Sequence, residues 1–477
     1  MMFSLPSIFQ YLLEVPVLFK IGVVGSGPCG LLFANILLKN GFSVTMLDIG
    51  SSEESSIDIT DSLKTLKLNG NSNCSYDINQ FEKIETTSTR KWFTSKSLLG
   101  FSQVWGGTWQ ENTKEVDSNW NIAYQKIDEI LNFNEAHLSI AGVLSQCDCL
   151  TMNFISGDQL NSKAINHYRT KLLFKDFSED PKFSEDSYIN QNIIWDADVL
   201  FRSCLSYKNF TYQNNYYVRD IVSTNSKLVI NSFNSESFDF DFIALAGGPV
   251  SNATILIRSN IADQIILKDT RLVYVPFLNL RPTPRHKHGF SHSLFSVDIL
   301  TYSGSGYHLQ FYSHLEKVLE RILVIIPSKF RAFFKFVFVY FSRYFGVILV
   351  YANKDLSQSI CFSIDENIVK ARNVKSKLTN PKLRLFKDLT FKLLNFGLIP
   401  LWFFAKFTTT GESYHLGSAS GVEMNLNGSI KQFPNVYILG TFAFKDLYPG
   451  PVTKSAMAQT YLAAVDLVKK LNLGGER

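Results

Sequence analysis

A glycine-rich turn near the start of the chain has the residue types and the spacing needed to hold a dinucleotide. Gly25, Gly27 and Gly30 form the pattern GxGxxG, with Pro28 inside it, and Asp48 follows about 20 residues later. Gly25 permits a tight turn, Gly27 lets the backbone approach a pyrophosphate, and Gly30 lets a helix pack closely on a strand. Asp48 can accept hydrogen bonds from ribose hydroxyls. These residues predict a dinucleotide site, and by themselves do not distinguish NAD from FAD.

The elements expected around the turn would position these residues correctly. Residues 21–24 are short and apolar, as in a buried strand, and residues 31–38 continue as an apolar helix. A second strand over residues 43–47 ends at Asp48. The N-terminus of the helix offers free N–H groups and a positive dipole end to the phosphates. The order strand, helix, strand, acidic residue is that of a Rossmann-type unit, and an ordinary glycine-rich turn would lack it.

Bulk properties limit the class of protein. The 477 residues suffice for two domains, and 47 basic against 42 acidic residues are too balanced for a nucleic-acid-binding protein. Six cysteines are too sparse for a disulfide framework. The apolar N-terminus lacks the basic start and the cleavage site of a signal peptide, and no stretch has the roughly 18 apolar residues of a spanning helix. We expect a cytoplasmic protein, with contact to a membrane surface left open.

Four later segments carry further motifs. They read SLLGFSQVWGGTW (97–109), WNIAYQKIDEI (120–130), FIALAGGPVSNATILIRS (242–259) and NVYILGTFAFKDLYPGPVTKSAMAQTYLAAVDLVKKL (435–471). The third is a strand, a double-glycine turn and a helix. The fourth is a strand, a loop and a long final helix. Together with the dinucleotide turn, these segments resemble the glucose–methanol–choline (GMC) oxidoreductases, in particular the smaller bacterial members.

The resemblance implies a flavoprotein that holds FAD non-covalently on a Rossmann-type domain. Besides the residues of the first turn and Asp48, it places the following near the cofactor: Gly100, Ser102, Trp105, Gly106, Gly107, Val218, Ala246, Gly247, Gly440, Thr441, Pro451 and Val452. The final helix begins near Pro451, a favourable first-turn residue, and its positive end would stabilise a reduced flavin. Since no second GxGxxG occurs, we expect the substrate itself to donate the hydride.

The resemblance also points to a catalytic histidine. His415, in GESYHLGSASG, matches the family's catalytic His, and a neutral imidazole can accept a hydroxyl proton near neutral pH. The alternative is a histidine that only forms hydrogen bonds in the core. The family's second polar residue, a His or Asn, falls here on about Pro451, which has no donor. We expect the second polar group to be missing or to come from Tyr448, Thr453 or Lys454.

A histidine-rich stretch, RHKHGFSHS, contains His286, His288 and His292. No carboxylate lies at ligand spacing, and the flanking sequence alternates as in strands, so we expect no metal site there. We expect these histidines to lie along the face or at the edge of a sheet in the second domain. His308, in GYHLQFYSH, could face its pocket.

Residues 321–351 combine aromatic and basic side chains. Lys329, Arg331, Lys335 and Arg343 interrupt the apolar run, so it cannot span a bilayer. Drawn as a helix, the stretch separates basic residues from a Phe-rich half, which is typical of an interfacial helix. A core helix or strand of the substrate domain is the alternative.

We therefore predict an α/β fold: a Rossmann-type FAD domain built from discontinuous segments, and a mainly β substrate domain. The expected boundaries are 19–139, 205–270 and 407–477 for the FAD domain, and 140–204 and 271–406 for the substrate domain.

The predicted activity is transfer of a hydride from a CH–OH group of a sugar, lipid-linked sugar or other alcohol to flavin N5. Two alternatives stay open. One is a desaturase or isomerase acting on a lipid or isoprenoid. The other is an FAD-bound protein that has lost catalysis, as Pro451 would permit. The electron acceptor is not predicted.

Overall fold

The structure is a computed structural model of the whole chain. It describes residues 19–50, 84–86, 95, 97–103, 105, 107–111, 118–131, 165–169, 195–224, 227–280, 295–300, 306–313, 331, 336, 344–352, 356, 358–374, 381–395, 397–408 and 416–474.

A five-stranded parallel sheet forms the centre of the first domain. Its strand order is β20 (Val436–Ile438), β9 (Phe242–Leu245), β1 (Lys20–Val24), β2 (Ser43–Leu47) and β5 (Phe210–Gln213). Every neighbouring pair is parallel. The strands are short and apolar because both faces are covered, and adjacent residues of β1 enter different cores.

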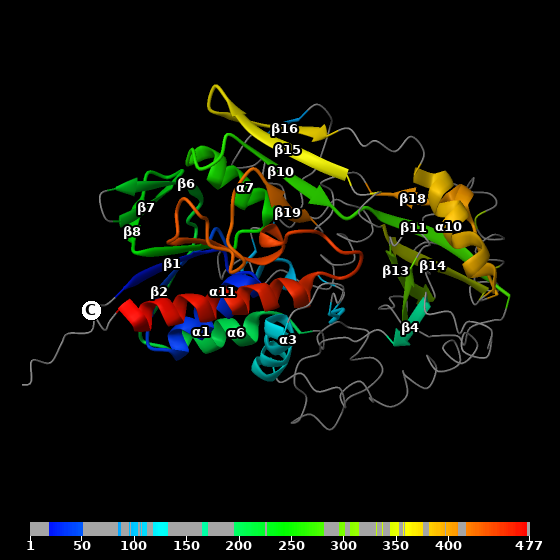
Figure 1. Cartoon of the computed structure of the whole chain (residues 1–477), viewed down its shortest axis with the longest axis horizontal. Helices are drawn as coiled ribbons and strands as arrows, with labels where there is room; N and C mark the ends of the chain where they lie inside the picture. Colours follow the sequence, from blue (N-terminus) through cyan, green and yellow to red (C-terminus); the bar gives the residue numbers. More distant parts are fainter. Residues whose placement is uncertain are drawn as a thin grey trace, which may run out of the picture.

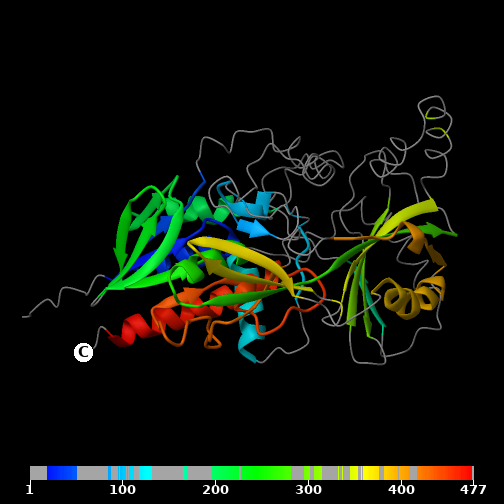
Figure 2. The same cartoon turned by 90° about the horizontal axis from the view of Figure 1, so that it is seen from above.

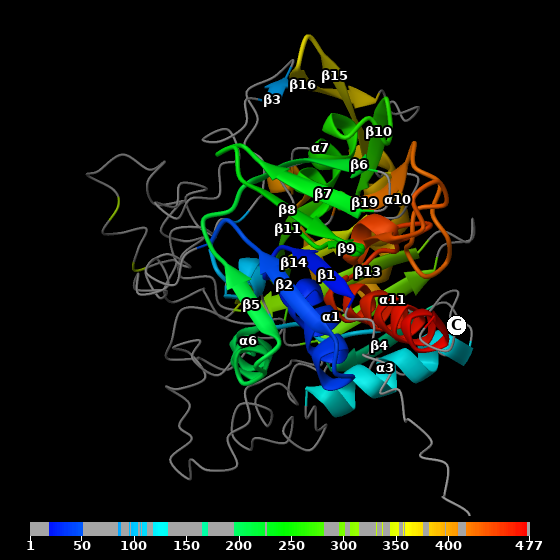
Figure 3. The same ribbon diagram turned by 90° about the vertical axis from the view of Figure 1, so that its left-hand side faces the viewer.

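Four helices cover one face of this sheet (Figures 1 and 3). They are α1 (Pro28–Lys39), α3 (Ser118–Ile130), α6 (Asp198–Leu205) and α11 (Thr453–Gly474). The helix α1 lies beside α11 and α6, and Asn35 Nδ2 donates a hydrogen bond of 2.7 Å to Ser203 Oγ. The final helix therefore packs directly on the helix that follows the glycine turn.

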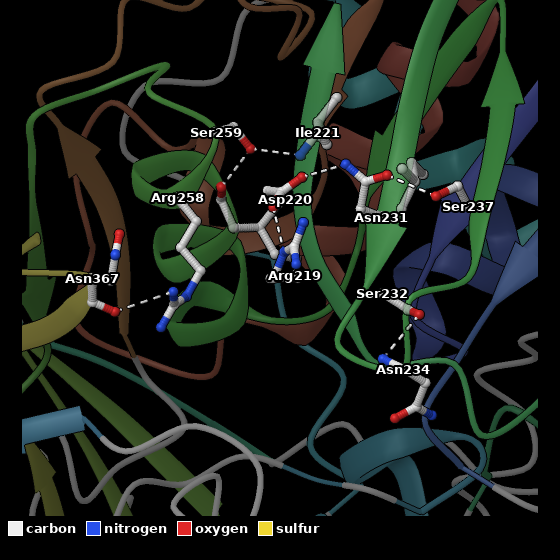
Figure 4. Close-up of polar contacts among 12 residues, drawn as sticks. Arg219, Asp220, Ile221, Asn231, Ser232, Asn234, Ser237, Arg258, Ser259 and Asn367 are labelled. Carbon is white, nitrogen blue, oxygen red and sulfur yellow. Dashed lines mark hydrogen bonds and ion pairs between the residues drawn. The ribbon is translucent and has the colours of Figure 1, made fainter.

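A three-stranded meander and one helix cover the other face. The meander is β6 (Val218–Thr224), β7 (Lys227–Ser232) and β8 (Ser237–Phe240), and the helix is α7 (Pro249–Arg258). Figure 4 shows how the end of α7 holds its neighbours: Ser259 Oγ accepts the Ile221 N–H at 2.8 Å, and Arg258 reaches Asn367 O at 3.4 Å. Within the meander, Asn231 Nδ2 donates to Asp220 at 2.7 Å (Figure 4).

A second five-stranded sheet lies beyond α7. Its order is β19 (Leu416–Ser420), β10 (Gln264–Asp269), β15 (Gln358–Asp365), β16 (Ile368–Val374) and β3 (Ile84–Thr86). The strands β15 and β16 come from the range expected for the substrate domain, yet they pair with β10. The range 271–406 therefore contributes to two sheets.

A seven-stranded sheet forms the other end of the molecule (Figure 2). Its order is β17 (Leu398–Pro400), β11 (Leu272–Asn279), β14 (Phe345–Tyr351), β13 (Gly306–Ser313), β12 (Phe295–Leu300) and β4 (Ile165–Arg169), with β18 (Lys406–Phe407) also on β11. The helix α10 (Pro381–Asn395) covers one face through Leu385, Leu389 and Leu393.

The predicted fold class is confirmed: a Rossmann-type domain from separated segments is joined to a mainly β part. The 321–351 stretch is divided. Its last seven residues form the central strand β14, while Arg331 and Phe336 are helical and exposed. The strand agrees with the core alternative for that part. Within the described residues, no helix has both the length and the apolar composition needed to cross a bilayer.

Candidate active site

The glycine turn lies at the carboxyl end of β1, and the absence of a side chain serves a different purpose at each glycine. Gly25 has φ of +99°, and a Cβ there would lie 2.7 Å from Ala246 O. A Cβ on Gly30 would collide with Gly25 O. A Cβ on Gly27, in contrast, would meet no heavy atom within 4 Å. Gly27 therefore faces open space at the first turn of α1, which is where a pyrophosphate would lie.

Asp48 follows the neighbouring strand, and the residue is 8% exposed. It accepts hydrogen bonds from Ser26 Oγ and, at 3.1 Å, from the Tyr212 hydroxyl. Burial raises the pKa of Asp48 to about 6, because an ionised carboxylate loses its hydration there, and the hydrogen bonds offset only part of this cost. The acceptor predicted for ribose hydroxyls is thus beside the open turn and already surrounded by hydroxyl donors.

The segment after residue 96 lies against the glycine turn. The Leu99 N–H donates to Ser26 Oγ at 3.0 Å, and a Cβ on Gly100 would lie 3.4 Å from Gly27 Cα. Ser102 Oγ donates to Leu99 O at 2.8 Å and accepts the Ala197 N–H at 3.1 Å. Gly100 and Ser102, both predicted cofactor residues, therefore belong to a loop that borders the open space.

Aromatic packing fixes the rest of this segment. The Trp105 indole donates to Trp195 O at 2.7 Å and meets the rings of Trp109 and Trp195 edge to face. Gly107 has φ of +70°, which suits only glycine well. Gly106, the other glycine of the predicted pair, lies outside the described residues.

Two distant segments close the site from the other side of β1. The Ala246 N–H donates to Val24 O at 2.8 Å, which places the turn of Ala246 and Gly247 beside the glycine turn. The Gly440 N–H donates to Gln459 Oε1 at 2.8 Å, and a Cβ on Gly440 would lie 3.3 Å from Cys29 Sγ. Residues predicted from separate motifs thus converge on the start of α1.

Val218 and Thr441, two predicted cofactor residues, lie close in the chain to residues that contact the glycine turn or Asp48. Val218 is buried at the start of β6, two residues after Tyr216, whose N–H donates to Asp48 O at 2.8 Å. Thr441 Oγ1 donates to Leu416 O at 2.7 Å. His415, the predicted catalytic residue, precedes Leu416 in the sequence and lies outside the described residues, as do His286, His288 and His292.

The loop before α11 contains Pro451 and Val452, two residues predicted to lie near the flavin. Pro451 and Val452 are buried, and Val452 O accepts the Ala456 N–H at 2.8 Å, which starts the final helix. Tyr448 is half-buried in the same loop. Pro451 thus lies at the start of the helix that packs on α1.

Lys454 occupies an ion-pair cluster that the sequence did not reveal. Its Nζ is 2.9 Å from Glu111 and 2.7 Å from Asp128, and its side chain is 3% exposed. The ammonium also lies over the rings of Trp109 and Tyr124, at 5.7 and 5.6 Å from their centroids. A lysine held between two carboxylates ties α11 to α3 and the 107–111 segment, and it is poorly placed to take a proton from a substrate.

The inner face of the seven-stranded sheet carries a polar row opposite these loops. His308 is fully buried, its Nδ1 is 2.9 Å from Asp298, and its ring meets Tyr351 edge to face. A Cβ on Gly450 would lie 3.5 Å from the His308 ring. The structure thus places His308 against the loop before α11, and its predicted place in a substrate pocket stays a prediction.

Gln310, two residues further along β13, continues this row. Its amide donates to Thr108 Oγ1 at 3.4 Å, and its carbonyl oxygen accepts from Tyr312 at 2.9 Å and Tyr351 at 3.2 Å. Thr108 follows Gly107 of the predicted flavin segment. Sequence reasoning missed Gln310, although polar residues at alternate positions of GYHLQFYS are the signal for a polar sheet face.

The described residues fit FAD. They provide a glycine turn with open space at Gly27, a helix N-terminus above it, the Asp48 carboxylate, and a second domain whose polar face is turned toward the loop before α11.

Fold and site together define a two-domain α/β protein with a Rossmann-type nucleotide site beneath a β-sheet. No family model matches the chain, and no curated protein matches its sequence. Among solved structures, it is similar to pyridoxine 4-oxidase from Mesorbium loti, with a TM-score of 0.58 and 13% identity over 94% of this chain and 99% of that one. At that identity the match establishes the fold, and the fold predicted from the GMC resemblance is confirmed.

Proposed function

We propose that the protein is an FAD-dependent oxidoreductase that takes a hydride from a CH–OH group of its substrate. The observation that carries the proposal is the open position at Gly27, bordered by Asp48 on the adjacent strand and by Gly100 on the covering loop. The fold shared with pyridoxine 4-oxidase, over nearly the whole length of both chains, supports the same class of activity.

Each group has a separate part in holding the cofactor. The backbone of Gly25, Gly27 and Pro28 and the dipole of α1 would hold the pyrophosphate, and Asp48 would accept the ribose hydroxyls. The start of α11, at Pro451 and Val452, would face the isoalloxazine ring, which supplies the hydride acceptor when FAD is bound. The positive end of α11 would favour the negative charge of the reduced ring.

The proton of the substrate hydroxyl needs an acceptor, and we assign it to His415. A neutral imidazole has the appropriate basicity, whereas Lys454 is engaged with Glu111 and Asp128. His415 adjoins Leu416, whose carbonyl oxygen is bonded to Thr441 of the predicted flavin site. Tyr448 is the next candidate on the loop before α11.

The test is anaerobic reduction of the bound flavin. The purified protein should be yellow, release FAD on denaturation, and bleach when its substrate is added without oxygen. The substrate panel should contain sugars, nucleotide sugars, lipid-linked sugars and pyridoxine, since the proposed substrate class is an alcohol. A colourless protein that cannot be reconstituted with FAD would refute the proposal.

The buried Pro451 favours one alternative, an FAD-bound protein without catalysis, since proline offers no donor where the family has a polar residue. Bound FAD that no alcohol bleaches would support it. A product with a new C=C bond in place of a carbonyl would instead indicate a desaturase.

A further inference from the structure

The helix α10 has apolar side chains on two faces. Leu385, Leu389 and Leu393 are fully buried against the seven-stranded sheet. The outward side nevertheless carries large apolar residues, among them Phe391, which is 77% exposed. Three more large apolar residues of α10 are exposed: Leu383 by 50%, Phe386 by 46% and Leu394 by 44%. An ordinary surface helix has polar residues on that side.

The short 3-10 helix η6 (Trp402–Phe404) extends this apolar surface. Phe403 is 91% and Phe404 66% exposed, and their rings meet edge to face. Trp402 anchors η6 to α10, because its indole donates to Thr390 at 2.9 Å and its ring meets Phe386. We call the outward residues Leu383, Phe386, Phe391, Leu394, Phe403 and Phe404 the α10–η6 surface.

The segment that carries this surface is predominantly basic. Residues 381–408 contain one acidic residue, Asp388, which accepts a hydrogen bond of 2.6 Å from Tyr307. The same residues contain five basic ones: Lys382, Arg384, Lys387, Lys392 and Lys406. Exposed aromatic rings among basic side chains are the composition of segments that lie in the interface of an anionic bilayer.

We propose that the α10–η6 surface docks the protein on an anionic membrane. A second copy of the chain is less suitable as the occupant, because a two-fold interface would place these basic residues against themselves. A bilayer accepts protruding rings between its lipids and supplies the negative charge. The helix α10 lies at the end of the molecule away from the first domain (Figures 1 and 2).

The proposal is independent of the activity proposed above, since it uses no residue of the candidate active site. The α10–η6 surface and the polar row of His308 and Gln310 lie on opposite faces of one sheet. Docking would therefore leave the polar face free to meet the flavin domain.

The test is co-sedimentation of the full-length protein with vesicles. We expect binding to phosphatidylcholine vesicles containing phosphatidylglycerol, and much weaker binding to phosphatidylcholine alone. The triple variant Phe391→Ser, Phe403→Ser, Phe404→Ser should lose binding by about 1,000-fold, because each of the three rings contributes roughly tenfold when buried in lipid. Leu426→Ser, which changes a residue 98% exposed elsewhere, is the matched control and should bind like the wild type.

Two further measurements make the result decisive. Lys387→Glu with Lys406→Glu should weaken binding to the anionic vesicles and leave the weak binding to phosphatidylcholine unchanged. Far-UV circular dichroism confirms that each variant is folded. Absence of wild-type binding at low salt, or unchanged binding of the triple variant, overturns the proposal. So does a wild-type dimer that the triple variant converts to a monomer, because a second copy would then cover the surface.

Discussion

Replacement of Asp48 by Asn tests the candidate cofactor site and its electrostatics together. The change keeps the shape of the side chain and its contacts with Ser26 and Tyr212, and removes the ionisable group. Its effect should differ between the flavin-free and the flavin-bound protein.

The magnitude follows from the pKa of Asp48, which burial raises from 3.8 to about 6. A carboxyl group whose pKa is higher in the folded chain favours folding while protonated, and this contribution is lost as the pH rises from about 4 to above 6. One pKa unit corresponds to about 1.4 kcal/mol, so ionised Asp48 costs the flavin-free protein about 3 kcal/mol at neutral pH. The Asp48→Asn variant does not titrate and should not pay this cost.

Urea unfolding of flavin-free protein at about pH 4 and about pH 8 measures the effect. The free energy of unfolding of Asp48→Asn, relative to that of the wild type, should rise by up to about 3 kcal/mol between these pH values. A constant offset from altered hydrogen bonds cancels in this difference. An unchanged difference would show that Asp48 is not a buried carboxylate with a raised pKa.

The same variant should bind FAD more weakly, because ribose hydroxyls donate more strongly to a carboxylate than to an amide oxygen. Wild-type affinity for FAD should also fall as the pH drops below about 6, since protonated Asp48 is a poorer acceptor. Isothermal titration of the flavin-free protein measures both. Gain of stability together with unchanged FAD affinity would place the ribose elsewhere.

Three further changes test the remaining assignments. Gly27→Val should fold with wild-type stability, because its Cβ position is open, yet bind no FAD in a reconstitution assay; a yellow variant would refute the pyrophosphate assignment. His415→Ala should retain FAD and slow its anaerobic reduction by about 10² or more in stopped-flow measurements, and equal rates would transfer the role to Tyr448. Lys454→Met should lower the free energy of unfolding by about 3 kcal/mol, because it leaves the carboxylates of Glu111 and Asp128 without their cation. Unchanged stability together with slow flavin reduction would instead indicate that Lys454 is catalytic.

The glycine turn and its strands could be predicted because their signals are local. The strand over residues 43–47 is observed with those bounds, while α1 begins at Pro28, three residues before the predicted helix. Proline is favoured in a first helical turn, where its missing N–H needs no partner, so the motif residues themselves start the helix.

The aromatic-basic stretch could not be assigned because periodicity does not separate a buried strand from a buried helix. Residues 345–351 form β14, whose neighbours β11 and β13 are supplied by chain many residues away. Among the described residues, exposed aromatic side chains near basic ones lie later, in α10 and η6. Their exposure depends on which side of α10 the sheet covers, and the sequence alone leaves both sides apolar.

The ion pairs of Lys454 could not be predicted from the sequence for a different reason. Glu111 and Asp128 precede it by more than 300 residues, and no local pattern relates the three positions. Only the packing of α11 on α3 brings them together. The resemblance made Lys454 a candidate for the second polar group, and the tertiary structure shows that its ammonium is paired with Glu111 and Asp128.

Strand β13 connects the two inferences about function. Its alternation directs His308 and Gln310 toward the loops of the first domain, while Leu309 and Phe311 join the core beneath α10. A shift of one residue in its pairing with β14 would exchange these two sets and bury polar groups against the leucines of α10. The core that supports α10 therefore also fixes which side chains reach the loop before α11. The register of one strand thus sets both the polar face beside the candidate site and the position of the α10–η6 surface.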